Sequence, residues 1–425
     1  MTNDEGRAQS NGIGCWLFRA GGAMIGERKY TVKLELRNVG QLRQAFVEFG
    51  DLTILVGPQA SGKSIFLQFL KLCLDARKVV SDMRKHGLEW QKDFTSFLGL
   101  YLGEGMSGLW SNGPNGSQVT IDDSVEDMTK VLRVKLGKHE PEEVLFYIPA
   151  QRVLALNQQG WWRPFSDYRP NDPYIARAFS ENIRLLMEQG RFAQAEGGLF
   201  PKSNRLKREI RDELDRAIFH GFGLTIDDVG GQKRLALVNR DAKHPFMVWS
   251  AGQREFVPLL LGLYWLMPPA KVSRRENLQW AVIEEVEMGL HPKAISAVML
   301  AVLDLVSRGY KVVLSTHSPH VLDVVWGIRT IQLHHAGYEP VLRVFGLKRT
   351  QPTQRLAEDV LQRSYRSYYF NPVLTLAPTV TDITGLDPGS PDAAEAGWGG
   401  LSEFSGRIAD IVAEVVAGAE QRRPE

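Results

Sequence analysis

The stretch Gly57-Pro58-Gln59-Ala60-Ser61-Gly62-Lys63-Ser64 decides the fold, because it is a complete G-x-x-x-x-G-K-S phosphate loop. It follows the apolar run 52–56 and precedes an apolar helical pattern that begins at Ile65. In this strand–loop–helix order, backbone N–H groups and the positive end of the helix can bind a polyphosphate. Lys63 would then reach the outer phosphates, and the hydroxyl of Ser64 would bind Mg²⁺. A chance glycine-rich turn is the alternative, but both flanks argue against it.

Bulk properties exclude several classes of protein. The 425 residues suffice for one large α/β domain with an appended segment. The net charge of +2 neither favours nor excludes nucleic acid, since a basic face can lie within a balanced total. The two cysteines, Cys15 and Cys73, form neither a disulfide framework nor a zinc motif. The polar N-terminus is unlike a signal peptide and no apolar run is long enough for a bilayer, so we expect a cytoplasmic protein.

Apolar runs of strand length alternate with helical patterns, which favours a mostly parallel sheet flanked by helices, preceded by an antiparallel meander. We therefore predict an α/β fold of the P-loop NTPase type with a small helical C-terminal appendage. The expected organisation is a poorly ordered segment 1–28, a nucleotide-binding domain 29–337 with a helical and loop lobe at about 87–245, and a helical extension 338–425. Individual predictions include strands near 119–121 and 131–136 and helices near 174–189, 204–219, 292–308, 353–367 and 402–417.

Polar residues follow three further apolar runs, each at the point where a strand is expected to end. Gln151 follows the run 144–148, and its amide could reach Mg²⁺ or an attacking water, although a surface glutamine here is commonplace. Glu284 and Glu285 follow the run 279–283, where one carboxylate can hold Mg²⁺ and the next can polarise a water. His317 follows the run 311–315 and can donate a hydrogen bond to a γ-phosphate oxygen. An ordinary charged turn and an inactive loop histidine are the alternatives.

A fourth motif, Trp249-Ser250-Ala251-Gly252-Gln253-Arg254-Glu255, opens a strongly apolar helical stretch. Small residues at a helix N-terminus leave N–H groups free for a phosphate. A plain serine cap with a glycine turn would have the same sequence, so the motif alone leaves both interpretations open.

The ordered set of motifs resembles a known family. The set begins with the phosphate loop and continues with Gln151 and Ser250-Ala251-Gly252-Gln253. It ends with Ile283-Glu284-Glu285-Val286-Glu287-Met288-Gly289-Leu290-His291-Pro292 and Ser315-Thr316-His317-Ser318-Pro319. Over about residues 30–335 the chain resembles an ABC-type ATPase head of the SMC and OLD-like class, and differs from a membrane transporter.

The resemblance implies ATP and Mg²⁺ as ligands and a head-to-head dimer that encloses two ATP molecules. It implies that Ser64, Glu284 and Gln151 serve Mg²⁺, that Glu285 activates water and that His317 senses the γ-phosphate. The nucleotide would also be bound by the phosphate loop, by Gln151 and, across the dimer, by Ser250, Ala251, Gly252 and Gln253. Adenine rather than guanine is implied by the family, and the chain lacks the Asn/Thr-Lys-x-Asp guanine motif.

The chain also departs from its family. Glu284 stands where many relatives have aspartate. The motif 249–255, which corresponds to the family's signature motif, lacks the usual leading leucine and second glycine. No long coiled-coil insertion interrupts the lobe 87–245. No Toprim nuclease pattern follows residue 335, since Asp382 and Asp387 lie in a proline- and glycine-rich segment. We therefore expect that the chain does not cut nucleic acid itself.

The sequence is compatible with three functions. The first is an ATPase switch that controls a separate effector such as a nuclease or toxin, as in bacterial anti-phage defence; this step rests on the family resemblance. The second is a DNA-binding ATPase of repair or recombination, for which two short basic clusters could supply the surface. The third is a scaffold that binds ATP without hydrolysing it. The basic clusters comprise Lys202, Arg205, Lys207, Arg208 and Arg211, and Arg274 with Arg275.

Two other features have more than one interpretation. Trp161 and Trp162 could stack on bases, but tryptophans in a proline-rich loop more often pack against their own domain. The amphipathic stretch 402–417 could dock a partner, a second copy of the chain or its own domain.

Overall fold

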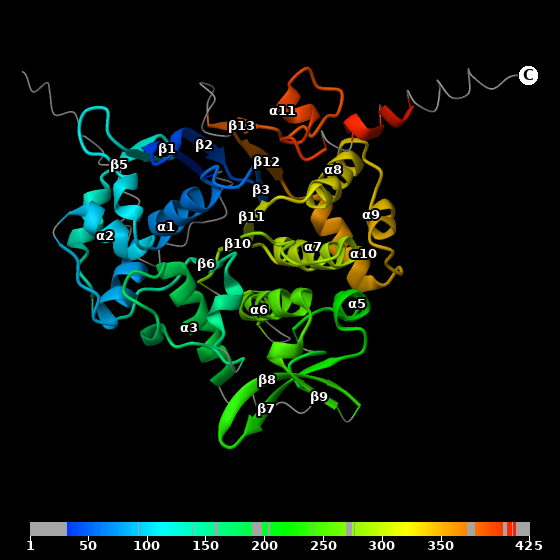
Figure 1. Ribbon diagram of the computed structural model, residues 1–425. Coiled ribbons are helices and arrows are strands. Elements are labelled where there is room, and N and C mark those ends of the chain that lie inside the picture. The colour runs from blue at the N-terminus through cyan, green and yellow to red at the C-terminus, as the bar shows by residue number, and fades with distance from the viewer. Residues whose placement is uncertain are drawn as a thin grey trace, which may run out of the picture.

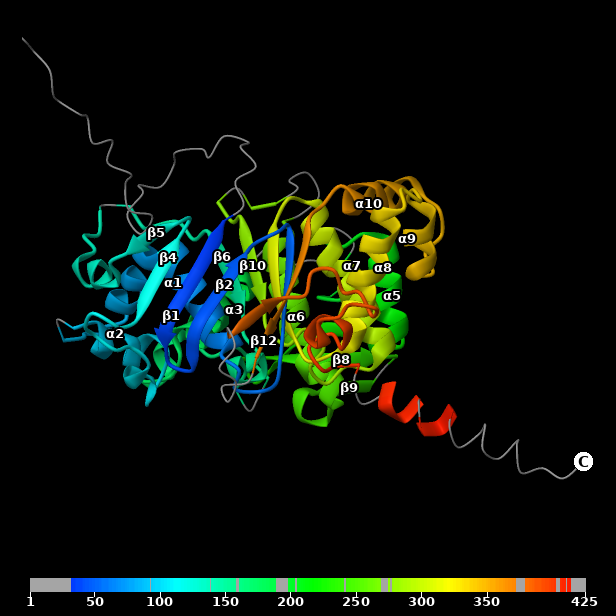
Figure 2. The same ribbon diagram turned by 90° about the horizontal axis from the view of Figure 1, so that it is seen from above.

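The computed structural model describes residues 32–91, 93–137, 139–157, 160–188, 198–202, 205–240, 242–268, 274–275, 277–371, 379–402, 406–409 and 411–413. The segment 1–28, expected to be poorly ordered, lies outside these residues. The described strands form three sheets, which are layered with helices as Figures 1 and 2 show.

A six-stranded, mostly parallel sheet forms the centre of the molecule. Its spatial order is β13 (Val380–Asp382), β12 (Tyr365–Phe370), β3 (Leu52–Val56), β11 (Lys311–Thr316), β10 (Trp280–Ile283) and β6 (Leu145–Ile148). All neighbours are parallel except the antiparallel pair β12–β13. The strands β3 and β10 are almost continuously apolar because helices or another sheet cover both faces. This arrangement confirms the predicted P-loop NTPase fold.

Alternate residues of each central strand enter two separate hydrophobic cores. In β10, Ala281 and Ile283 pack into one core, whereas Trp280 and Val282 pack into the other. This division follows from the two-residue side-chain period of a strand.

The first core lies between the central sheet and an antiparallel sheet of order β2 (Leu42–Glu48), β1 (Lys33–Val39), β4 (Gln118–Ile121) and β5 (Ser124–Glu126). The phosphate-loop helix α1 (Lys63–Lys85) and α2 (Phe94–Tyr101) fill this layer. Figure 2 shows the antiparallel strands beside α1. The predicted meander and the strand near 119–121 are thus confirmed, whereas residues 131–136 form no strand: Met128–Arg133 is a 3₁₀ turn.

Helices cover the other face of the central sheet. They are α3 (Tyr174–Glu188), α5 (Arg208–Leu214), α6 (Ala251–Leu266), α7 (Pro292–Ser307), α8 (Pro319–Leu333), α9 (Glu339–Val344) and α10 (Gln351–Leu361). Beyond α5 and α6 lies a small antiparallel sheet of β7 (Gly223–Val229), β8 (Gln232–Asn239) and β9 (Ala242–Pro245), at the lower end of Figure 1.

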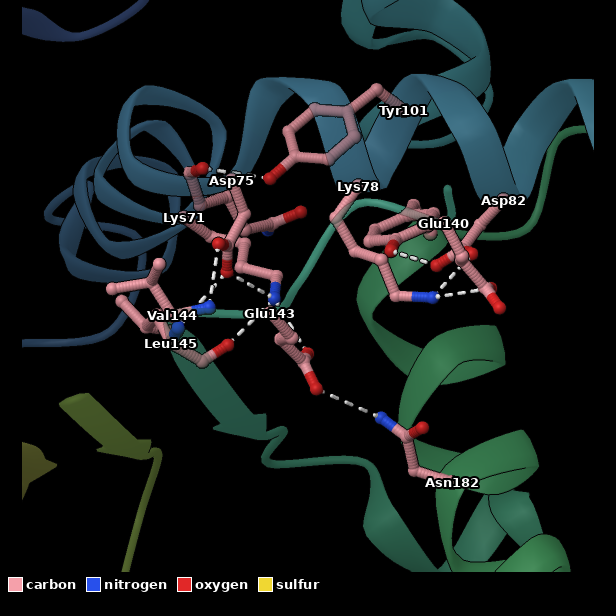
Figure 3. A network of polar contacts seen from close by, with 12 residues as sticks. Lys71, Asp75, Lys78, Asp82, Tyr101, Glu140, Glu143, Val144, Leu145 and Asn182 are labelled. Carbon is pink, nitrogen blue, oxygen red and sulfur yellow. Dashed lines mark hydrogen bonds and ion pairs between the residues drawn. The ribbon is translucent and has the colours of Figure 1, made fainter. Parts of the chain in front are cut away.

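A buried ionic network ties α1 to the start of β6 (Figure 3). The ammonium of Lys71 donates hydrogen bonds to Asp75 at 2.7 Å, to Glu143 at 2.7 Å and to the carbonyl of Leu145 at 2.6 Å. Asp75 also accepts the backbone N–H groups of Val144 and Leu145. Its own backbone is non-helical (φ −125°, ψ 24°), so α1 bends where the network forms. The helix that follows the phosphate loop is therefore anchored to the strand that leads to Gln151.

The expected division at residue 338 does not match the sheet. After α10, the strand β12 enters the central sheet beside β3, with Tyr365 opposite Leu52 and Tyr369 opposite Val56. The predicted helix 353–367 ends at Leu361, and residues 365–367 belong to this strand instead. The C-terminal region is thus not a helical extension alone. It also contains the short helix α11 (Ala393–Ala396).

The predicted helix 402–417 is only partly described. Residues 406–409 and 411–413 are helical, and Ile408, Ile411 and Val412 are about half exposed, with exposed fractions of 45%, 49% and 54%. Among the residues that the structure describes, no helix is both long and apolar enough to cross a membrane.

Candidate functional site

The phosphate loop has the backbone that its glycines permit. It begins after β3 and runs directly into α1 at Lys63. Gly57 and Gly62 have φ values of +146° and +97°, which favour glycine, and Ala60 also lies in the left-handed region at +58°. A Cβ at Gly62 would lie 2.5 Å from Cδ2 of Leu42, so β2 also restricts this position.

Lys63 lies folded over the loop. Its ammonium donates to the carbonyls of Gly57 (2.7 Å) and Pro58 (2.9 Å) and to Oγ of Ser61 (3.3 Å). Burial lowers the pKa of Lys63 to about 8, although Glu285, Glu287 and Glu284 act to raise it. A cation held in this way can exchange carbonyl oxygens for phosphate oxygens with little movement.

Glu284 lies buried at the end of β10, with 2% of its surface exposed. Its Oε2 accepts the backbone N–H of Ala150 at 3.2 Å, whereas Oε1 is buried without a hydrogen-bond partner. Burial raises the pKa of Glu284, and the hydroxyls of Ser64 and Tyr147 beside it act in the opposite direction.

An unpartnered carboxylate oxygen beside a serine hydroxyl is a suitable pair of ligands for Mg²⁺. Within the described part of the chain no cluster of three or more His, Cys, Asp or Glu has metal-binding geometry. Mg²⁺ commonly takes one or two protein oxygens and completes its shell with waters and substrate phosphates, so Ser64 and Glu284 fit this ion.

Glu285 and His317 meet at the same edge of the sheet. Oε1 of Glu285 lies 4.0 Å from Nε2 of His317, and both side chains are partly exposed. Burial, followed by the charge of Lys63, lowers the pKa of His317, so its imidazole is neutral at pH 7. The backbone N–H of His317 donates to the carboxylate of Glu287, a third acid of the loop after β10 for which the sequence pattern predicts no role.

The signature motif caps α6. Oγ of Ser250 accepts the N–H of Gln253 at 3.2 Å, and Oε1 of Gln253 accepts the N–H of Ser250 at 3.1 Å. This reciprocal capping box satisfies two backbone donors and leaves other first-turn N–H groups for a ligand. Ser250 and Ala251 are exposed, so this helix end is accessible from outside the chain.

Gln151 and Arg152 are neighbours with opposite environments. Gln151 is exposed, directly after the residue whose N–H binds Glu284. Arg152 is fully buried and donates to the carbonyls of Glu255, Glu284 and Glu285. No local sequence pattern predicts a role for Arg152, and its position directly after Gln151 is the only signal in the sequence.

The basic clusters mostly serve the fold. Lys202 is buried, Arg205 donates to the carbonyls of Tyr264 and Met267 at the end of α6, and Lys207 pairs with buried Asp304. Arg274 donates to the carbonyl of Gly309, and Arg275 donates to the carbonyl of Trp265 and stacks on its ring. Arg208 is the strongly exposed member, at 81%, and lies near Asp212.

The two tryptophans also pack within the protein. Trp162 is 1% exposed and contacts Phe179 edge-on, and Trp161 is partly buried against the same core. Trp162 is therefore not accessible to a base.

A family model and several solved structures are similar to parts of this chain. The model of the family described as "AAA domain, putative AbiEii toxin, Type IV TA system" matches residues 162–323, a range that holds the signature motif, both acids and His317. No curated protein matches the chain.

Similar solved structures include the SMC head domain from Thermotoga maritima. The sequence identity is 14%, the match covers 69% of this chain and 92% of that chain, and the TM-score is 0.31. An SMC head bound to the C-terminal winged-helix domain of ScpA has 12% identity, covers 69% and 91%, and has a TM-score of 0.35. A dimeric bacterial ABC transporter cassette has 14% identity, covers 68% and 89%, and has a TM-score of 0.28. These scores are low, so the fold is defined by the strand order above. Together with the family match over residues 162–323, this strand order supports a P-loop nucleotide-binding fold.

Proposed function

We propose that this protein binds and hydrolyses ATP, and that two copies enclose the nucleotides and act as a switch for a separate effector. The observation that carries the proposal is the meeting of Lys63, Glu284, Glu285 and His317 at the carboxyl edge of β3, β10 and β11. In an open parallel sheet, ligands bind outside this edge.

Each side chain has a role that its environment permits. Lys63 and the loop amides bind the phosphates, and Ser64 and Glu284 hold Mg²⁺, with Gln151 as a further candidate ligand. Mg²⁺ supplies charge neutralisation of the phosphate oxygens when it is bound. Glu285 is partly exposed, so its carboxylate can accept a hydrogen bond from the attacking water and orient it. Neutral His317 donates a hydrogen bond to the γ-phosphate.

Self-association is supported by the surface around the signature motif. Met247 and Val248, directly before it, are 65% and 64% exposed, and Leu154 in the turn after Gln151 is 61% exposed. Exposed apolar residues beside a helix end suited to phosphate are what an interface with a second copy would cover. Ser250, Ala251, Gly252 and Gln253 would then contact the nucleotide of that second copy.

The separate effector that this switch controls acts in bacterial defence. The matching family's description names a putative toxin of a type IV toxin–antitoxin system, which supports a function linked to a toxin-type effector. The alternative of DNA repair has less support, because most of the basic residues on which it rested pair within the fold.

The proposal is tested by mass photometry and phosphate release with the wild type and Glu285→Gln, with and without ATP and Mg²⁺. We expect Glu285→Gln to lose turnover by about a hundredfold or more and to accumulate as an ATP-dependent dimer. Glu339→Gln, at an exposed position of α9, is the control and should behave as wild type. A particle mass that does not change with ATP would contradict the switch. ATP binding by the wild type without any phosphate release would support the scaffold alternative.

A further inference from the structure

Arg152 connects two segments of the candidate site from a fully buried position. Its Nε donates to the carbonyl of Glu255 in α6 at 3.1 Å. Its Nη1 donates to the carbonyl of Glu284 at 2.9 Å, and its Nη2 donates to the carbonyl of Glu285 at 3.1 Å. One rigid guanidinium therefore joins α6, the signature helix, to the loop that holds Glu284 and Glu285.

The two carbonyls on that loop flank the Cα of Glu285. The carbonyl of Glu284 belongs to the peptide before this Cα, and that of Glu285 belongs to the peptide after it. Holding both oxygens with one planar group restricts both backbone angles of Glu285. This restriction matters because Glu285 has a φ of +44°, a left-handed conformation that costs a non-glycine residue about 1 kcal/mol or more.

A third contact completes the restraint. The N–H of Glu285 donates to Oγ of Ser315 at the end of β11, at 3.2 Å. The backbone of Glu285 is thus held from β11 on one side and by Arg152 on the other. Its side chain, by contrast, is partly exposed.

The first turn of α6 also packs directly on this loop. A Cβ at Gly252 would lie 2.9 Å from the carbonyl oxygen of Gly289, and a Cβ at Gly289 would lie 3.2 Å from Cγ of Glu255. A shift of α6 along this loop would therefore displace either the loop or the carbonyl of Glu255 that accepts from Arg152.

We propose that Arg152 is a positioning residue that makes the orientation of Glu285 depend on the signature helix of the same chain. This inference rests on the proposed function. In the two-copy assembly, α6 contacts the second copy's nucleotide, whereas Glu285 acts on the chain's own nucleotide. Arg152 thus links one ATP site to the other, and the two sites hydrolyse ATP cooperatively.

The test compares Arg152→Lys and Arg152→Met with Arg177→Lys. Lysine keeps the charge but cannot hold carbonyls on both sides of Glu285 with one planar group, and methionine removes the charge at similar length. Arg177 is the matched control: it is 1% exposed, donates to the carbonyl of Leu100 at 2.8 Å and lies over the ring of Phe165, away from the acids.

Three measurements on each full-length variant separate positioning from folding. They are the dissociation constant of a fluorescent ATP analogue, the ATP dependence of hydrolysis, and hydrogen–deuterium exchange of residues 251–255 and 284–290. For Arg152→Lys we expect nucleotide affinity within about threefold of wild type and kcat about ten- to a hundredfold lower. We expect the Hill coefficient to fall from near 2 toward 1 and exchange to rise in both segments.

Failure of the two proposals is distinguishable. If the wild type does not hydrolyse ATP, the proposed function is contradicted. Hydrogen–deuterium exchange still tests whether Arg152 links α6 to the loop 284–290, because exchange requires no ATP hydrolysis. The positioning role is overturned if Arg152→Lys and Arg152→Met leave exchange of the two segments unchanged. It is also overturned if hydrolysis and Hill coefficient match those of Arg177→Lys. Should Arg152→Met fail to fold, Arg152→Lys decides the outcome.

Discussion

Gly57, the first residue of the phosphate loop, lies directly against the carbonyl of Phe370, the last residue of β12. A Cβ at position 57 would lie 2.5 Å from this oxygen and 3.1 Å from Cβ of Phe370. The strand β12 joins the central sheet beside β3, so its end borders the loop that follows β3. The shape of the candidate nucleotide site therefore depends on a strand close to the C-terminal end of the chain.

This contact predicts a specific cost for Gly57→Ala. Because the obstacle is a backbone oxygen, either β12 or the loop must move, which we expect to lower the free energy of unfolding by about 2–3 kcal/mol. The same displacement should weaken ATP binding by about tenfold or more. Gly87→Ala is the control, since Gly87 also has a positive φ (+73°) but nothing lies within 4 Å of a Cβ there. Urea unfolding and nucleotide titration would measure both effects, and equal losses in the two variants would contradict the steric explanation.

Lys63 should take up a proton when ATP binds at alkaline pH. Burial lowers the pKa of Lys63 to about 8, so much of it is neutral at pH 8.5, and a bound triphosphate favours the charged form. We expect an uptake of roughly 0.5–1 proton per ATP at pH 8.5, little at pH 7, and weaker binding as pH rises above 8.

Calorimetry in two buffers of different ionisation enthalpy measures this uptake. Lys85→Met, which removes a lysine that is 66% exposed, should leave it unchanged. Identical binding heats in the two buffers at pH 8.5 would show that Lys63 stays charged throughout.

Glu284→Gln should separate metal binding from stability. A buried carboxylate costs more than a neutral amide, and the amide oxygen can still accept the N–H of Ala150, so the free energy of unfolding should not fall. Hydrolysis should nevertheless fall by about a hundredfold, because the Mg²⁺ ligand is lost.

A second expectation for Glu284 concerns pH. Its pKa is raised by burial, and Mg²⁺ binds the carboxylate form, so Mg²⁺ affinity should decline as pH falls, beginning at a higher pH than for an ordinary glutamate. Mg²⁺ titrations of wild-type hydrolysis between pH 5.5 and 8 measure this shift, with Glu339→Gln as control. A pH-independent Mg²⁺ requirement would place the ion elsewhere.

Lys71→Met should destabilise the protein strongly. It would leave the carboxylates of Asp75 and Glu143 without their shared cation, and a buried ion pair broken in this way typically costs about 3–5 kcal/mol. Lys78→Met is the comparison, because Lys78 is 18% exposed and its pairs with Asp82 and Glu140 are better solvated, so we expect a loss of about 1 kcal/mol. Chemical unfolding measures both losses, and a similar loss in the two variants would show that the Lys71 network contributes no more than the partly buried pairs of Lys78.

Much of the candidate site could be predicted because its motifs are local. Each consists of an apolar strand followed by short polar residues, and the carboxyl ends of parallel strands meet at one edge of a sheet. Ser64, Glu284, Glu285 and His317 therefore lie where the pattern placed them. The capping box of Ser250 and Gln253 was likewise encoded within four residues.

The sequence by itself determined the phosphate loop, its flanking strand and helix, and the residue types at the neighbouring strand ends, since periodicity and backbone preference act over a few residues. The tertiary structure alone decided that β12 joins the sheet, that Arg152 is buried between two segments, and that Arg205, Lys207 and Arg275 pair inside the fold. Whether a charged side chain faces solvent or holds distant carbonyls depends on which segments pack around it, and no local pattern specifies those long-range neighbours.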